Sequence, residues 1–203
     1  MSGPSWSIRS SSVTQQVRCG IICRVQASPA LVLSGPPGVG KTSVGWRVFD
    51  RCTDLGQDPA FADLDLLGAA WPAPDDDPHQ SRLKATNLAA VWSNYRQAGS
   101  RQLIVAGVVE NLGERRSLEE ATGGSVVICR LDAPDTELAQ RIHGRAREGG
   151  ADLAKLVARA SELSAQLVAE DVSDYSVGTA GRTIDDVADD VLARWKGDAI
   201  SDR

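Results

Sequence analysis

Short apolar runs alternate with longer amphipathic segments from residue 30 to the end of the chain. The runs have the length of β-strands and lie at Ala30–Ser34, Ala60–Leu64, Gln102–Val109, Ser125–Leu131 and Asp174–Val177. The third run (QLIVAGVV) is apolar almost throughout, which is typical of a parallel strand covered on both faces. We therefore predict five strands in one parallel sheet.

The segments between these runs carry apolar residues at helical spacing. They predict helices at Thr42–Cys52, Pro78–Ala98, Ser117–Ala121, Pro134–Glu148 and Asp152–Glu170, and a last helix that opens at Thr183-x-x-Asp186. For the second of these helices we expect Asp77 as the N-cap, Pro78 in the first turn and Gln80 as the capping-box partner. Strands that alternate with helices predict an α/β fold, here three layers with helices on both faces of the sheet.

Composition and length limit the class of protein. A single core accommodates 203 residues, so we expect one domain at 29–203, preceded by a weakly structured Ser- and Gln-rich extension at 1–28. The net charge of −5 argues against a broad nucleic-acid surface. No apolar run approaches the roughly 18 residues of a membrane span, and because the first 20 residues contain no continuous hydrophobic segment we do not expect them to be a secretory signal. We expect a cytoplasmic protein with reduced cysteines and no nucleic-acid or membrane partner.

The most specific motif is GPPGVGKT at Gly35–Thr42, which matches G-x-x-x-x-G-K-[ST] with a strand before it and a helix after it. Its glycines let backbone N–H groups turn toward phosphate oxygens, and the helix N-terminus adds positive potential. Lys41 is expected to reach the β- and γ-phosphates, and the Thr42 hydroxyl to bind Mg²⁺. We predict that ATP contacts Gly35, Pro36, Pro37, Gly38, Val39, Gly40, Lys41, Thr42 and Ser43.

A pair of carboxylates, Asp63 and Asp65, ends the second predicted strand. Residues at i and i+2 of a strand point to the same side, so we expect both to face the phosphate site. A carboxylate there can take the proton of an acceptor hydroxyl or hold a Mg²⁺-bound water. The alternative is a helix cap or a solvated loop. The third run lacks the Walker-B aspartate of motor ATPases and Ras-like GTPases, because glycine and apolar residues follow it.

With these motifs the chain resembles the small P-loop kinases: shikimate kinase, gluconate kinase, chloramphenicol phosphotransferase and the related AAA_33-type ATP-binding proteins. The resemblance covers about residues 30–196. It rests on GPPGVGKT, FADLD at Phe61–Asp65, IVAG at Ile104–Gly107, LAQRIHGRAR at Leu138–Arg147, and YSVGTAGRTIDDVADDVL at Tyr175–Leu192.

The resemblance implies roles for individual residues. Asp63 would be the base or a ligand of a Mg²⁺-bound water, and Asp65 the acceptor contact, or the reverse. Arg141 would pack on the adenine side. A short lid near 142–152 would bring Arg145 or Arg147 to the phosphates. The segment Gly178–Arg182 would be the loop at the nucleotide base, with Thr179 and Arg182 near ATP.

Together these patterns predict a kinase that transfers the γ-phosphoryl group of ATP to the hydroxyl of a small molecule, with Mg²⁺ as cofactor. A nucleoside or nucleotide kinase and a non-catalytic ATP-binding switch are the alternatives. Acceptor identity stays open, as do the choice between a monomer and a small homo-oligomer and the roles of Trp71, Glu110 and Asp75–Asp77. For Gly107, we expect a close approach of the acceptor to the backbone.

Overall fold

The computed structural model of the chain describes residues 30–144 and 151–201. The predicted extension at 1–28 and most of the predicted lid lie outside these ranges. Five parallel strands form one sheet in the order β2-β3-β1-β4-β5. Their bounds are β1 Ala30–Ser34, β2 Pro59–Asp63, β3 Gln102–Ala106, β4 Val126–Asp132 and β5 Tyr175–Gly178. The predicted α/β fold with a five-stranded parallel sheet is therefore confirmed.

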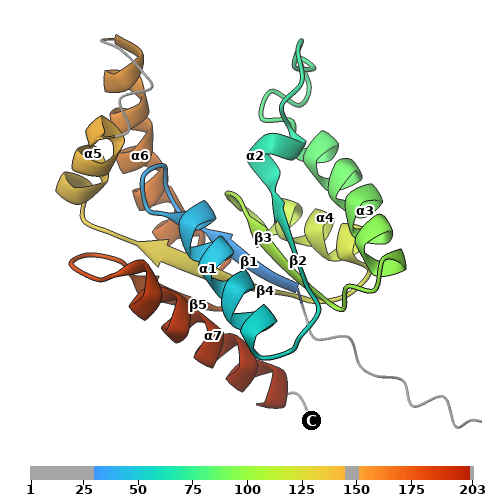
Figure 1. Cartoon of the computed structure of the whole chain (residues 1–203). Coiled ribbons are helices and arrows are strands. Elements are labelled where there is room, and N and C mark those ends of the chain that lie inside the picture. The colour runs from blue at the N-terminus through green and yellow to red at the C-terminus, as the bar shows by residue number, and fades with distance from the viewer. Residues whose placement is uncertain (1–29, 145–150, 202–203) are drawn as a thin grey trace, which may run out of the picture.

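Seven helices are present in the described ranges: α1 Lys41–Asp54, α2 Leu64–Leu67, α3 Ser81–Gln97, α4 Leu112–Thr122, α5 Asp135–Gly144, α6 Ala151–Glu170 and α7 Ile184–Ser201. Figure 1 shows α1 beside α7 on one face of the sheet and α3 beside α4 on the other, while α5 packs against α6. None of the helices in the described ranges is both long and apolar enough to cross a bilayer.

The core has two halves, one on each face of the sheet. Successive side chains of a strand point to opposite faces. In β1, Leu31 and Leu33 therefore join the cluster under α1 and α7, while Ala30 and Val32 join the cluster under α3 and α4. All five residues of β1 are buried. The strand that precedes the phosphate loop is thus held on both sides by apolar packing.

Two predicted helix starts are wrong. Helix α3 begins at Ser81, because the Asp77 carboxylate accepts hydrogen bonds from the N–H groups of Ser81 (2.8 Å) and Arg82 (3.1 Å). Gln80 has a left-handed backbone and donates to the carbonyl of Ala70, so it is no capping-box partner. Helix α4 begins five residues before Ser117, at Leu112.

The third strand also ends earlier than predicted, at Ala106, and the chain then bends away at Gly107. A Cβ atom built on Gly107 would lie 2.5 Å from Leu64 Cδ1. The absence of a side chain therefore makes room for α2 to pack on the end of β3. The expectation that Gly107 admits the acceptor is wrong, because Leu64 occupies that space.

Candidate active site

The phosphate loop joins the carboxyl end of β1 to α1. Gly35 has φ 143° and a Cβ there would lie 2.6 Å from the carbonyl oxygen of Leu131, so only glycine fits. Gly40, with φ 103°, is the N-cap residue of α1, and no atom lies within 4 Å of the position its Cβ would take. The side of the loop at Gly40 is therefore open, next to the first N–H groups of the helix.

Lys41 and Thr42 start α1 and lie at the mouth of this loop. Lys41 Nζ donates to the carbonyl oxygens of Gly35 (2.8 Å) and Pro36 (3.2 Å). Thr42 Oγ1 donates to Asp63 Oδ2 at 2.9 Å. Ser43 is exposed one position further along the helix. The ammonium, the hydroxyl and one carboxylate thus converge where the sequence predicts the β- and γ-phosphates and Mg²⁺.

The two carboxylates of the FADLD motif have different surroundings. Asp63 ends β2 and caps α2, since its Oδ1 accepts a hydrogen bond from the N–H of Asp65 at 2.9 Å. The chain turns into a helix after Asp63, so the two side chains do not extend in parallel from a strand, and that expectation is wrong. The Asp65 side chain is 68% exposed and lies 3.8 Å from Lys84 Nζ of α3. Only Asp63 contacts the phosphate loop, and it serves as a helix cap as well.

Arg141 of α5 links three segments. Its guanidinium donates to Thr179 Oγ1 (2.8 Å), to the carbonyl oxygen of Thr179 (3.0 Å) and to that of Val39 in the phosphate loop (3.3 Å), and it pairs with Glu137. Thr179 is buried and follows β5. Arg141 thus connects the phosphate loop to the segment after β5, and the nucleotide contacts expected for Arg141 and Thr179 stay predictions.

Arg182, also predicted near ATP, makes its described contacts elsewhere. Arg182 donates to the carbonyl oxygens of Gly178 and Asp186 and pairs with Asp190 at 3.0 Å, so it braces its own loop against α7. Arg145 and Arg147 lie outside the described residues.

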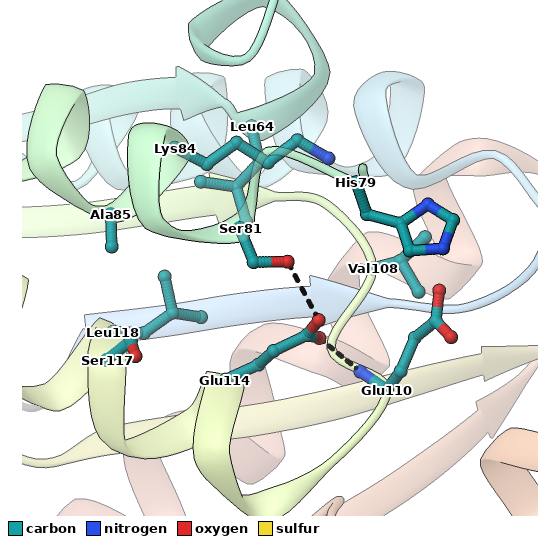
Figure 2. Close-up of a pocket in the computed structure, with 10 residues that line it drawn as sticks. All are labelled: Leu64, His79, Ser81, Lys84, Ala85, Val108, Glu110, Glu114, Ser117 and Leu118. Atoms are coloured by element: carbon teal, nitrogen blue, oxygen red, sulfur yellow. Dashed lines mark hydrogen bonds between the residues drawn. The ribbon is translucent and has the colours of Figure 1, made fainter. Parts of the chain in front are cut away.

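A pocket with a cavity volume of about 40 Å³ lies beside Leu64 of the FADLD motif, between α2, α3 and α4 (Figure 2). Its lining residues are Leu64, His79, Ser81, Lys84, Ala85, Val108, Glu110, Glu114, Ser117 and Leu118. Sequence reasoning singled out Glu110 but missed Ser81 and Glu114. A signal for Glu114 existed in Asn111-x-x-Glu114, because the Asn111 side chain caps α4 by accepting from the Glu114 N–H at 3.0 Å.

Hydrogen bonds fix the carboxylate wall of this pocket. Glu114 accepts from the Ser81 hydroxyl (2.9 Å) with one oxygen and from the Glu110 N–H (2.7 Å) with the other. The Glu110 carboxylate accepts from Arg159 (2.8 Å) and Gln166 (3.1 Å), both on α6. The wall therefore joins α3, the β3–α4 loop, α4 and α6.

The residues at the phosphate loop fit ATP and Mg²⁺. In the described ranges no three His, Cys, Asp or Glu side chains form a metal cluster, so a cation here would need oxygens of the nucleotide as well. Thr42 Oγ1 and Asp63 Oδ2, which are hydrogen-bonded at 2.9 Å, are hard oxygen donors of the kind that Mg²⁺ prefers. The open loop at Gly40 supplies backbone N–H groups for phosphate oxygens.

Solved structures share this fold. A gluconokinase from Sinorhizobium meliloti 1021 matches with a TM-score of 0.60 and 22% identity over 86% of this chain and 95% of its own. A tunicamycin resistance protein from Deinococcus radiodurans matches with a TM-score of 0.59 and 23% identity over 82% and 95%. A shikimate kinase from Acinetobacter baumannii, in complex with shikimate, matches with a TM-score of 0.58 and 20% identity over 84% and 94%.

The sequence itself gives no match among curated proteins. It does match a family model, described as the AAA domain AAA_33, over residues 31–168. This range runs from β1 to α6 and includes the phosphate loop, the FADLD motif, the pocket wall and Arg141. Because the model covers more than half of the 203 residues, the chain belongs to the AAA_33 family of P-loop AAA domains.

Proposed function

We propose that the protein is an ATP- and Mg²⁺-dependent phosphotransferase that acts on a hydroxyl group of a small molecule bound in the pocket beside Asp63. The observation that carries the proposal is the contact of Asp63 with Thr42. It joins the phosphate loop to the segment that leads into the pocket, since the next residue, Leu64, lines that pocket. Donor and acceptor sites are thus adjacent.

Each residue has a role that follows from its position. Backbone N–H groups of the loop and the Lys41 ammonium would bind the phosphates, and Thr42 and Asp63 would hold the cation or a water bound to it. Bound Mg²⁺ would neutralise charge on the β- and γ-phosphates. Arg141 positions the loop through the Val39 carbonyl and the base-side loop through Thr179. Arg145 and Arg147 remain candidates for the phosphate contacts of a lid.

The reaction balances as a direct displacement. The acceptor oxygen forms a bond to the γ-phosphorus, the bond from that phosphorus to the β–γ bridging oxygen breaks, and ADP leaves. The hydroxyl proton passes to Asp63 or to water. Asp63 is partly exposed and each of its oxygens already accepts one hydrogen bond, which leaves lone pairs that could take the proton.

The alternatives receive less support from the pocket. A nucleoside or nucleotide kinase needs aromatic rings for the base or arginines for an acceptor phosphate. The lining residues of this pocket contain no Trp, Tyr, Phe or Arg. Trp71, the aromatic candidate for stacking, is 92% exposed, and Arg82 pairs with Asp76 at 2.8 Å. A switch protein without an acceptor leaves the pocket and its ordered carboxylate wall unexplained.

The test is acceptor-dependent ADP release by the purified protein with ATP and Mg²⁺, across sugars, sugar acids, aminocyclitols, nucleosides and phenicols. We expect at least one class to raise the rate well above the ATPase background, and Lys41→Ala to abolish the increase. Binding of ATP without stimulation by any class would favour the switch.

A further inference from the structure

The pocket between α2, α3 and α4 has an unusual distribution of polar groups (Figure 2). Four of its lining residues are apolar: Leu64, Ala85, Val108 and Leu118. Two glutamates, Glu110 and Glu114, line it as well, and Lys84 is the only lysine or arginine among the lining residues. Such a site combines two carboxylate acceptors with apolar surface and with the polar groups of Lys84, His79, Ser81 and Ser117.

The charges of this lining do not cancel. Lys84 Nζ lies 3.8 Å from the Asp65 carboxylate, and Glu110 is paired with Arg159. Glu114 receives only a hydroxyl and a backbone N–H, and within the described ranges it forms no ion pair with a Lys or Arg. After the pairs are counted, one negative charge is left over at the wall of the pocket.

We propose that the acceptor is a hydroxylated molecule without an acid group, either neutral or bearing an amine. This inference rests on the proposed phosphotransferase function and names its substrate class. A carboxylate or phosphate on the acceptor would meet like charge at Glu114 and would compete with Asp65 for Lys84. Hydroxyl and ammonium groups instead donate to carboxylate oxygens, which can only accept. The apolar lining residues are suited to the carbon atoms of such an acceptor.

The preference for cations is measurable without knowing the acceptor. Cysteine is placed in the pocket as Ser117→Cys or Ala85→Cys, and at the exposed Val168 of α6 as a control, in a chain with Cys19→Ser and Cys23→Ser. Each variant is reacted with a methanethiosulfonate that carries either a quaternary ammonium or a sulfonate. Relative to the control position, we expect the cationic reagent to be favoured by about tenfold in the pocket. Equal rates, or faster reaction of the anionic reagent, would overturn the proposal.

A charge-only variant shows which group is responsible. Glu114→Gln removes the charge and keeps an oxygen for the Glu110 N–H, while its NH2 group can donate to the Ser81 hydroxyl oxygen. It should bring the cation preference at Ser117→Cys close to that of the control. Arg101→Gln, at the amino end of the parallel strands, should leave the preference unchanged. A preference that survives Glu114→Gln would contradict the assignment to Glu114.

A matched series of acceptors tests the chemistry itself. D-gluconate, D-glucitol and D-glucamine share one polyol chain and differ at one end as a carboxylate, an alcohol and an amine. Both glucitol and glucamine should exceed gluconate as acceptors or as inhibitors of the best acceptor. If gluconate is best and Lys84→Met removes only that activity, Lys84 binds an acid and the proposal is wrong. If no compound raises ADP release but the labelling still shows a cation preference, the phosphotransferase proposal is refuted. The negative charge of the pocket is then still established.

Discussion

The hydroxyl of Thr42 donates to the carboxylate of Asp63 at 2.9 Å, across 21 positions of sequence. Thr42 stands in the first turn of α1, while Asp63 ends β2, and β3 lies between β1 and β2 in the sheet. The contact therefore bridges over the end of β3. It brings a carboxylate to the phosphate loop in a chain whose third strand carries no acid of its own.

Asp63→Asn tests this relationship with little change in structure. Asparagine caps helices as well as aspartate: its amide oxygen can still accept from the Asp65 N–H, and its NH2 group can donate to the Thr42 hydroxyl oxygen, so thermal stability should change little. Loss of the charge should lower acceptor-dependent ADP release by about 10²-fold or more. The check is the rate as a function of Mg²⁺ concentration beside a melting curve. A variant that melts normally and keeps the full rate would exclude Asp63 as base or cation ligand.

Arg141→Met tests the link from α5 to the phosphate loop. The variant keeps a long apolar stem and loses the hydrogen bonds to Val39 and Thr179. These contacts hold the phosphate loop against α5, so without them ATP must itself order the loop, and we expect about a tenfold weaker affinity for ATP. Titration calorimetry with ATP and Mg²⁺ measures it. Arg101→Met is the matched control. Arg101 directly precedes β3, at the amino end of the parallel strands and away from the phosphate loop, and its side chain is 73% exposed. Equal affinities of the two variants would contradict the role given to Arg141.

The sequence predicted the sheet and the phosphate loop because both depend on local signals. A continuous apolar run identifies a buried parallel strand, and the glycines of the loop are required by backbone geometry at residues such as Gly35. Arg141 and Thr179 were found through resemblance, and Thr42 and Asp63 through their motifs.

The pocket could not be predicted in this way. Ser81, Glu110 and Glu114 come from three segments that only the packing of α3 on α4 brings together. Asp65 was misjudged because the sequence did not reveal that the chain enters α2 directly after Asp63. Gly107 was given to the acceptor, since nothing in its neighbours along the chain indicates that Leu64 fills the space beside it.

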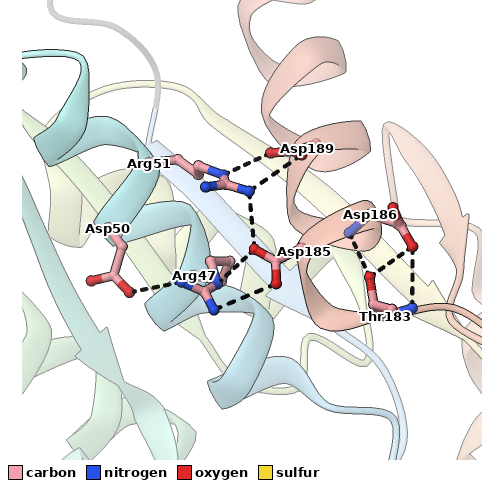
Figure 3. A network of polar contacts seen from close by, with 7 residues as sticks. All are labelled: Arg47, Asp50, Arg51, Thr183, Asp185, Asp186 and Asp189. Atoms are coloured by element: carbon pink, nitrogen blue, oxygen red, sulfur yellow. Dashed lines mark hydrogen bonds and ion pairs between the residues drawn. The ribbon is translucent and has the colours of Figure 1, made fainter.

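Helix α7 is held by apolar packing more than by its ion pairs. Arg47 and Arg51 of α1 face Asp185 and Asp189 of α7 at 2.9–3.1 Å (Figure 3). These side chains are about one-third or more exposed, so salt screens them. Trp195 is almost fully buried, and Trp195→Ala should cost about 3–5 kcal/mol of unfolding free energy.

The matched comparison is Arg51→Gln. It should lower the unfolding free energy far less than Trp195→Ala, and in high salt it should have no measurable effect. Urea denaturation at low and high ionic strength decides between the two contributions. If Arg51→Gln were as destabilising as Trp195→Ala, and equally so in salt, the ion pairs would be the main attachment of α7.

The thiol of Cys129 on β4 should be unreactive in the folded protein. Burial raises the pKa of its thiol from the ordinary value of 9.0 to about 12, against smaller opposing effects of Tyr175 and Arg194. At pH 8 only about one molecule in 10⁴ would then carry the thiolate that reacts. Cys52 is buried too, and burial raises the pKa of its thiol. In a chain with Cys19→Ser and Cys23→Ser, neither residue should react with Ellman's reagent until the protein unfolds. Labelling within seconds under native conditions would show that β4 or α1 opens readily.

The same pKa shift makes the unfolding free energy depend on pH in the alkaline range. The pKa of the Cys129 thiol is higher in the folded state than in the unfolded state, so folding favours the protonated form. Its contribution is complete below about pH 9 and is lost as pH rises toward 12. Cys129→Ala should flatten this part of the profile of unfolding free energy against pH, and an unchanged profile would exclude Cys129 as its source.

The Glu110–Arg159 pair should couple the acceptor pocket to α6. The two side chains are 19% and 38% exposed and 2.8 Å apart, so a double-mutant cycle with Glu110→Gln and Arg159→Met should give a coupling of about 0.5–1 kcal/mol in unfolding free energy. Gln166 also binds Glu110, at 3.1 Å, and keeps part of the attachment in the Arg159 variant.

The functional consequence separates a positioning role from a merely structural one. If Arg159 holds Glu110 at the pocket wall, Arg159→Met should raise the KM for the acceptor and leave the affinity for ATP unchanged. Lys155→Met, on the same helix with an 80% exposed side chain, is the control. An Arg159 variant that loses stability with no change in KM would limit the pair to holding α6 on the sheet.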